Sequence, residues 1–161
     1  MENNNEYYIV TPKLANQIDF VKLSPTAQAP VRGSEQAAGW DLYADINGDY
    51  ISLYPGEVRK ISTGIAIALP KDTFGAVFAR SGLSTKKGLA PANKVGVIDS
   101  DYRGEIKVAL HNHSNVSQTI LKGERVAQMV ITNYYPCTYI ESDSLDKTTR
   151  GEGGFGSTGR K

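Results

Sequence analysis

The sequence lacks several features that would place a protein outside the cell or in a membrane. Its one cysteine, Cys137, has no second cysteine in the chain to pair with, which favours a reducing compartment. No apolar run approaches the ~18 residues that a membrane-spanning helix needs. The N-terminus begins with the polar, acidic residues 1–6 and has no basic region followed by an apolar run, so it does not resemble a secretion signal. These absences predict an intracellular protein, cytoplasmic or nuclear and not secreted, with no membrane partner.

An excess of either charge is absent as well. The chain has 18 Lys and Arg residues against 17 Asp and Glu residues. Because a balanced charge gives no long-range attraction for a polyanion, the composition predicts no nucleic-acid partner. Evidence for function must therefore come from particular residues and their spacing.

Glycine and proline are plentiful. Sixteen glycines and seven prolines separate many short apolar runs, a pattern typical of an all-β domain. Residues 58–69 are apolar on both faces, which predicts a strand covered on both sides. Cys137 lies in a tyrosine-rich, strand-like segment and is expected to be a buried filler. With 161 residues, the chain is long enough for one domain.

Three regions of the chain differ in composition. Residues 1–17 have no steady periodicity and predict a flexible N-terminal extension. Residues 18–140 carry the apolar runs and predict the β core. Residues 141–161 begin as a polar, acidic linker and end as a glycine-rich tail.

The middle of the chain predicts a hairpin. Residues 95–98 have the apolar character of a strand end, and residues 100–104 have the Ser, Asp and Gly of a turn. In residues 106–110 every second position is apolar, which predicts a strand with one buried face.

Two carboxylates, Asp99 and Asp101, lie at the tip of this hairpin. The ordinary interpretation is that both favour the turn. However, Asp99 directly follows the apolar pair Val97 and Ile98, where the chain should be half-buried. An acid held at the edge of a core is a candidate general base. The hairpin alone leaves both interpretations open.

A second polar segment, residues 80–88, predicts a short helix. Ser81 can cap its start, basic residues suit its last turn, and Gly88 suits the position beyond it. The free amides at the start of a helix, together with Arg80, would form an anion site. A structural turn with an exposed arginine fits the same residues.

The C-terminal tail combines backbone flexibility with one aromatic ring. Five of the sixteen glycines lie in residues 151–159, around Phe155. No helix can follow this glycine pattern and no βαβ unit surrounds it, so it is not a dinucleotide-binding fingerprint. Its amides could wrap phosphates while Phe155 stacks on a flat ring. The alternative is a disordered glycine-rich tail.

Five segments in this order resemble those of the trimeric dUTP diphosphatases, the dUTPase family. They are residues 38–42, 80–83, 96–104, 123–128 and 150–159. The resemblance implies a jelly-roll-like distorted β-barrel with one short helix, assembled as a homotrimer. It also implies active sites between subunits, each covered by the glycine-rich tail of a neighbouring chain.

The resemblance further implies hydrolysis of dUTP to dUMP and pyrophosphate, by attack of water on the α-phosphorus. Mg²⁺ would be bound across the triphosphate. The reaction keeps uracil out of DNA and supplies dUMP for thymidylate synthesis. Such chemistry needs positioning, charge neutralisation and a base, with little covalent work by the protein.

The same resemblance assigns roles to residues by position. Asp99 would activate the water, and Asp41 would support the metal through a water molecule or order the tail. Tyr102 would lie against the sugar and exclude a ribose, and Phe155 would stack on the uracil. The other substrate-binding residues fall into three groups: Asn93, Gly96, Val97, Ile98 and Lys107 at the base; Arg80, Ser81, Gly82 and Gln128 at the phosphates; and Arg150, Gly156, Ser157 and Thr158 in the closing tail.

Some positions depart from the family pattern, and two other functions are alternatives to the hydrolase. Ala79 stands where proline is common, and Trp40 where a smaller or phenolic residue is usual. A dCTP deaminase has the same barrel but needs a glutamate acid–base in the hairpin region, where this chain has Asp99. A non-catalytic interaction module should have lost Asp99 or the tail, and this sequence has kept both.

Overall fold

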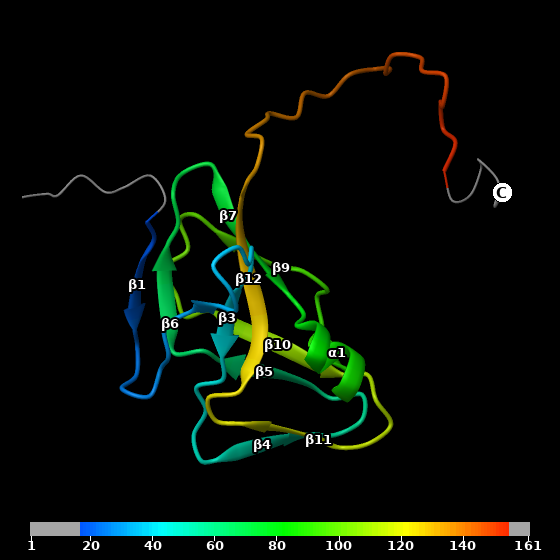
Figure 1. Ribbon diagram of the computed structural model, residues 1–161. Coiled ribbons are helices and arrows are strands. Elements are labelled where there is room, and N and C mark those ends of the chain that lie inside the picture. Colours follow the sequence, from blue (N-terminus) through cyan, green and yellow to red (C-terminus); the bar gives the residue numbers. More distant parts are fainter. Residues whose placement is uncertain (1–16, 155–161) are drawn as a thin grey trace, which may run out of the picture.

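The computed structural model describes residues 17–154, and these residues form twelve strands and one short helix (Figure 1). The all-β class with one short helix is therefore confirmed. No helix among residues 17–154 is long and apolar enough to cross a membrane. In chain order the elements are β1 (Asp19–Lys22), β2 (Val31–Arg32), β3 (Trp40–Tyr43), β4 (Tyr50–Leu53), β5 (Val58–Ser62), β6 (Ile65–Ala68), β7 (Thr73–Phe78), α1 (Ser81–Lys87), β8 (Leu89–Pro91), β9 (Gly96–Asp99), β10 (Lys107–Asn112), β11 (Gln118–Leu121) and β12 (Arg125–Asn133).

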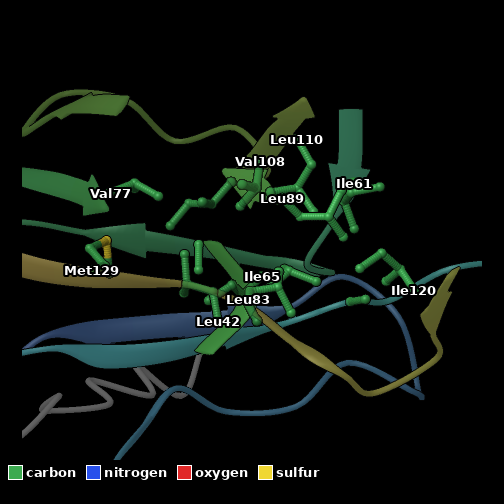
Figure 2. Packing of buried hydrophobic residues seen from close by; sticks show 14 of the residues in the cluster. Leu42, Ile61, Ile65, Val77, Leu83, Leu89, Val108, Leu110, Ile120 and Met129 are labelled. Atoms are coloured by element: carbon green, nitrogen blue, oxygen red, sulfur yellow. The ribbon is translucent and has the colours of Figure 1, made fainter. Parts of the chain in front are cut away.

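The strands pair antiparallel in four sheets. The largest has the order β2-β3-β12-β7-β9, a second has β5-β10-β8, and β1-β6 and β11-β4 are two-stranded. Apolar side chains from these sheets and from α1 form one core (Figure 2). Residues 134–154 leave the sheets after β12 without forming a strand (Figure 1).

The predicted hairpin around Asp99 is wrong in its pairing. Strand β9 pairs with β7, whereas β10 pairs with β5 and β8 in another sheet. The buried face predicted from the apolar alternation in residues 106–110 is confirmed, because Ile106, Val108 and Leu110 are almost fully buried. Sequence spacing indicated the strands, but their partners come from elsewhere in the chain.

Residues 58–69 form two strands instead of one. The chain turns at Gly64, whose φ of 66° lies in the left-handed region that favours glycine. Strand β5 then pairs with β10, and β6 pairs with β1. The expectation that both faces would be covered is confirmed for β6, where Ile65, Ala66 and Ile67 are all buried.

Two smaller expectations also need correction. Helix α1 begins at Ser81, and the residue at its N-cap is Arg80, which makes no side-chain capping hydrogen bond. Gly88 does end the helix, with a left-handed φ of 65°. Cys137 is exposed and not buried, since the segment that contains it forms no strand in this chain.

Candidate functional site

Two guanidinium groups meet one buried carboxylate beside helix α1. Asp41 in β3 is 8% exposed. Its Oδ1 accepts a hydrogen bond from Nε of Arg80 at 2.7 Å, and its Oδ2 accepts one from Nη1 of Arg125 at 3.1 Å. The one carboxylate of Asp41 thus pairs with two guanidinium groups, so these three side chains together carry a net charge of plus one. We call Asp41, Arg80, Arg125 and the nearby Gln128 the arginine cluster.

Gln128 joins this cluster through the sheet. It lies opposite Asp41 in β3 and opposite Phe78 in β7. Its Nε2 donates to the carbonyl oxygen of Ala79 at 2.9 Å, just before Arg80. Three of the segments that carry the resemblance therefore come together here through antiparallel pairing.

The start of α1 adds free amides next to Arg80. The amides of Leu83 and Ser84 both donate to the carbonyl oxygen of Arg80 at 3.0 Å. Ser81 and Gly82, as the first two residues of the helix, have no acceptor within it. Both residues are exposed, so an anion can reach them.

A second region contains the candidate base. A pocket of about 450 Å³ lies between β9, β5 and the beginning of β10. We call it the Asp99 pocket. It is lined by Lys60, Val97, Ile98, Asp99, Tyr102, Glu105, Lys107 and Ala109.

Asp99 is exposed in this chain, so the expectation of a half-buried acid is wrong. The apolar residues before it do not enclose it, since Val97 is 60% exposed. Hydrogen bonds stabilise the turn that follows. The amide of Tyr102 donates to the carbonyl oxygen of Asp99 at 3.1 Å. The Nη1 atom of Arg103 donates to the carbonyl oxygens of Ser100 and Tyr102.

The edge of β9 offers backbone groups next to this pocket. Among the described strands β9 pairs only with β7, so the peptide groups on its other edge have no strand partner. Its residues Val97 to Asp99 line the pocket, with Gly96 at the beginning of the strand. Asn93 is exposed in the turn before β9. Lys107 begins β10, and its Nζ lies 3.1 Å from Oε2 of Glu105.

The two regions are far apart within one chain. Asp99 lies opposite Phe74 in β7, whereas Gln128 lies opposite Phe78. Four residues of a strand span about 13 Å, and β9 and β12 lie on opposite sides of β7, about 10 Å apart. The base and the arginine cluster therefore do not form one compact site within this chain.

Of the predicted tail residues, the structure describes only Arg150. Its Nε donates to the carbonyl oxygen of Gly153 at 2.8 Å, which closes a local turn. Phe155, Gly156, Ser157 and Thr158 lie outside the described residues, as do residues 1–16 of the expected N-terminal extension.

Comparison with known proteins shows the family of this chain. The family model described as dUTPase matches residues 26–159. The chain belongs to the dUTPase family. The deoxyuridine 5'-triphosphate nucleotidohydrolase of Desulfitobacterium hafniense is 47% identical over 144 residues, covering 89% of this chain and 95% of that protein. The protein of the same name from Rickettsia felis is 49% identical over 144 residues, covering 89% and 97%.

Solved structures of dUTPases have the same fold. The dUTPase of Staphylococcus bacteriophage 80alpha, described with dUpNHpp, superimposes with a TM-score of 0.81 at 27% identity. The match covers 89% of this chain and 99% of that one.

Sequence reasoning missed three charged residues of these two regions. Arg125 belongs to a segment that the resemblance already included, so its place in the cluster could have been suspected. Lys60 and Glu105 reach the Asp99 pocket because β5 pairs with β10. No local pattern in the sequence indicates that pairing.

Proposed function

We propose that this protein hydrolyses dUTP to dUMP and pyrophosphate, with water attacking the α-phosphorus. The observation that carries the proposal is that segments typical of the dUTPase family form two complementary regions. One is a pocket with a carboxylate, and the other is a net positive cluster beside free amides. Together they supply a base, a nucleoside pocket and phosphate donors, which are the groups that phosphoryl transfer needs.

The Asp99 pocket would hold the nucleoside and the attacking water. Asp99 would take a proton from that water, as a general base must lie within hydrogen-bond reach of it. The free edge of β9 from Gly96 to Asp99, with the backbone at Lys107 and the side chain of Asn93, would bind the edge of uracil. Cytosine reverses the hydrogen-bond pattern of that edge, and unpaired buried polar groups carry a large penalty. Tyr102 would lie against the deoxyribose.

The arginine cluster would hold the phosphates. Arg80 presents a half-buried guanidinium, and the exposed residues Ser81 and Gly82 beside it present backbone amides. Charge-assisted hydrogen bonds of this kind suit phosphate oxygens. Gln128, which borders Arg80 through its bond to Ala79, would help to position water and phosphate.

Magnesium would enter with the triphosphate. Among residues 17–154 no group of three or more His, Cys, Asp or Glu side chains could hold a metal ion. Both oxygens of Asp41 accept hydrogen bonds from guanidinium groups. We therefore propose that Mg²⁺ is held mainly by phosphate oxygens, where it neutralises developing charge, and that Asp41 orients the two arginines.

We further propose a homotrimer of jelly-roll-like distorted barrels with active sites between subunits. The separation of Asp99 from the arginine cluster supports this arrangement, because a second copy can bring its arginine cluster to the first copy's Asp99 pocket. Closed symmetry would repeat the contact at three sites. Residues 18–140 would form the core unit of each subunit, whose barrel strands end at Asn133, and residues 1–17 would be a flexible extension outside it.

The tail would complete each site. Residues 141–161 would cross to a neighbouring subunit, where Phe155 would stack on uracil. Arg150, Gly156, Ser157 and Thr158 would close over the γ-phosphate. Such a lid suits a reaction that must exclude bulk water and then release its product.

Pyrophosphate release from dUTP, dCTP, dTTP and UTP in the presence of Mg²⁺ tests the proposed function. We expect release from dUTP at least about a hundredfold faster than from the other three nucleotides. Ammonia from dCTP would instead indicate a deaminase. No release from any nucleotide by the folded protein would contradict the proposal and favour a binding module.

A further inference from the structure

Residues 105–106, just before β10, are attached by three hydrogen bonds to residues 63–65, where the chain turns from β5 into β6. The amide of Gly64 donates to Oε1 of Glu105 at 3.0 Å. The amide of Ile106 donates to the carbonyl oxygen of Ile65 at 2.9 Å, and Oγ1 of Thr63 donates to the carbonyl oxygen of Ile106 at 2.6 Å. Residues 105–106 are therefore fixed against residues 63–65.

Glu105 is the side chain in this attachment that faces the Asp99 pocket. Its second oxygen, Oε2, lies 3.1 Å from Nζ of Lys107. Burial alone would raise the pKa of Glu105, but the amide of Gly64 and the ammonium of Lys107 together hold this pKa below its ordinary value. The carboxylate is thus charged near neutral pH and bonded through both oxygens.

Tyr102 is attached to the backbone of the same residue. Its hydroxyl donates to the carbonyl oxygen of Glu105 at 3.0 Å. The ring lies directly over Gly104, where a side-chain carbon would collide with the phenol. Tyr102 is otherwise 45% exposed, so this hydrogen bond and this contact set the position of its ring.

We propose that Glu105 is a positioning residue that fixes the Tyr102 ring and so sets the preference for deoxyribose over ribose. The proposal rests on the function proposed above for the Asp99 pocket. The carboxylate of Glu105 accepts the hydrogen bond from Gly64. The carbonyl oxygen of Glu105 accepts the hydrogen bond from the Tyr102 hydroxyl and so fixes the ring beside the position proposed for the sugar. Without the carboxylate the ring can move, and a small movement leaves room for a 2'-hydroxyl.

The test compares Glu105→Ala with Glu57→Ala. Glu57 is a matched control, because it also accepts a backbone amide hydrogen bond, from Tyr54 at 2.8 Å, and also pairs with a cation, Arg59. It does not line the Asp99 pocket. The readouts are the ratio of kcat/KM for dUTP to that for UTP, and the ratio of the dissociation constants of UMP and dUMP from calorimetry.

We expect Glu105→Ala to lower both ratios about tenfold, with kcat for dUTP within about threefold of the original. Glu105→Gln keeps an acceptor for Gly64 but loses the charge beside Lys107, so its loss should be smaller. Glu57→Ala should leave both ratios unchanged. If Glu105→Ala does not fold, Tyr102→Phe, which removes the phenol hydrogen bond, should reproduce the loss.

Unchanged ratios in folded Glu105→Ala or in Tyr102→Phe would overturn the proposal. An equal loss in Glu57→Ala would also overturn it, because the effect would then be a general loss of stability. If the unmodified protein hydrolyses no nucleotide, the proposed function fails, whereas the comparison of dUMP with UMP still decides whether Glu105 sets the preference for deoxyribose.

Discussion

The arginine cluster and the Asp99 pocket differ in how complete each is within one chain. In the arginine cluster Asp41 is bonded to two guanidinium groups, and Gln128 is bonded to Ala79. In the pocket Asp99 is exposed and forms no ion pair among the described residues. One region is held in place by its own chain, whereas the other leaves its carboxylate free for water, substrate or a second copy.

This difference predicts which substitutions should change the reaction kinetics and which should change the stability of the fold. An exposed side chain without an ion pair can be changed with little loss of stability, so its effect must appear in the reaction. A residue inside a network affects both.

The largest effect is expected for Asp99→Asn. Loss of the general base should lower kcat about a thousandfold, while the melting temperature changes little because Asp99 is exposed. Steady-state kinetics with dUTP and a thermal melt measure the two quantities. Asp101→Asn, in the same exposed turn, is the matched control and should stay within about twofold of the original. Equal losses in both variants would show that the turn, and not the base, is responsible.

A mixed effect is expected for Asp41→Asn. Asparagine has one acceptor oxygen and no charge, so one of the two arginines loses its anchor. KM for dUTP should rise about tenfold, and the free energy of unfolding should fall by about 2 kcal/mol. Urea unfolding and steady-state kinetics measure these changes.

The control for Asp41 is Glu124→Gln, because Glu124 pairs with Lys87 at 2.7 Å nearer the surface. Its loss should cost less than about 1 kcal/mol and leave KM unchanged. A change in KM without any change in stability for Asp41→Asn would mean that the carboxylate contacts the substrate and does not anchor the arginines.

The smallest effect is expected for Gly39→Ala. The added carbon would lie 2.5 Å from Oε1 of Gln128, so the amide must move away from Ala79. We expect kcat to fall about fivefold, since the loss concerns positioning only. Gly33→Ala, where nothing lies within 4 Å of the added carbon, should have no effect. An unchanged kcat in Gly39→Ala would exclude Gln128 from the reaction.

Much of the molecule could be predicted from short-range patterns. The alternation in residues 106–110 correctly indicated one buried face, and Gly88 correctly indicated the end of α1. The family could be predicted too, because its segments are continuous in sequence. Such features depend on neighbours a few residues apart.

The errors concern partners far apart in the chain. Asp99 was expected to be half-buried because its neighbours are apolar, but exposure depends on which strands pack beside β9. No local sequence pattern indicated a role for Glu105, since its hydrogen bond to Gly64 joins residues 41 positions apart. Cys137 lies in an apolar segment that this chain alone leaves exposed.

The most direct test of the central claim is complementation between two inactive variants. Asp99→Asn keeps the arginine cluster, and Arg80→Gln keeps the Asp99 pocket. If each site uses the pocket of one subunit and the cluster of another, co-expression with two different tags should restore activity. Random assembly into trimers would complete about one site in four, and about one site in three in the mixed trimers.

Doubly tagged protein, purified on both tags, should therefore hydrolyse dUTP at least a hundredfold faster than either variant alone. The control is each variant co-expressed with itself, one copy with each tag, and purified in the same way. It should stay inactive. Restored activity would establish that two copies share one site. A mixed assembly as inactive as its parents would contradict the account and place both groups in the site of a single chain.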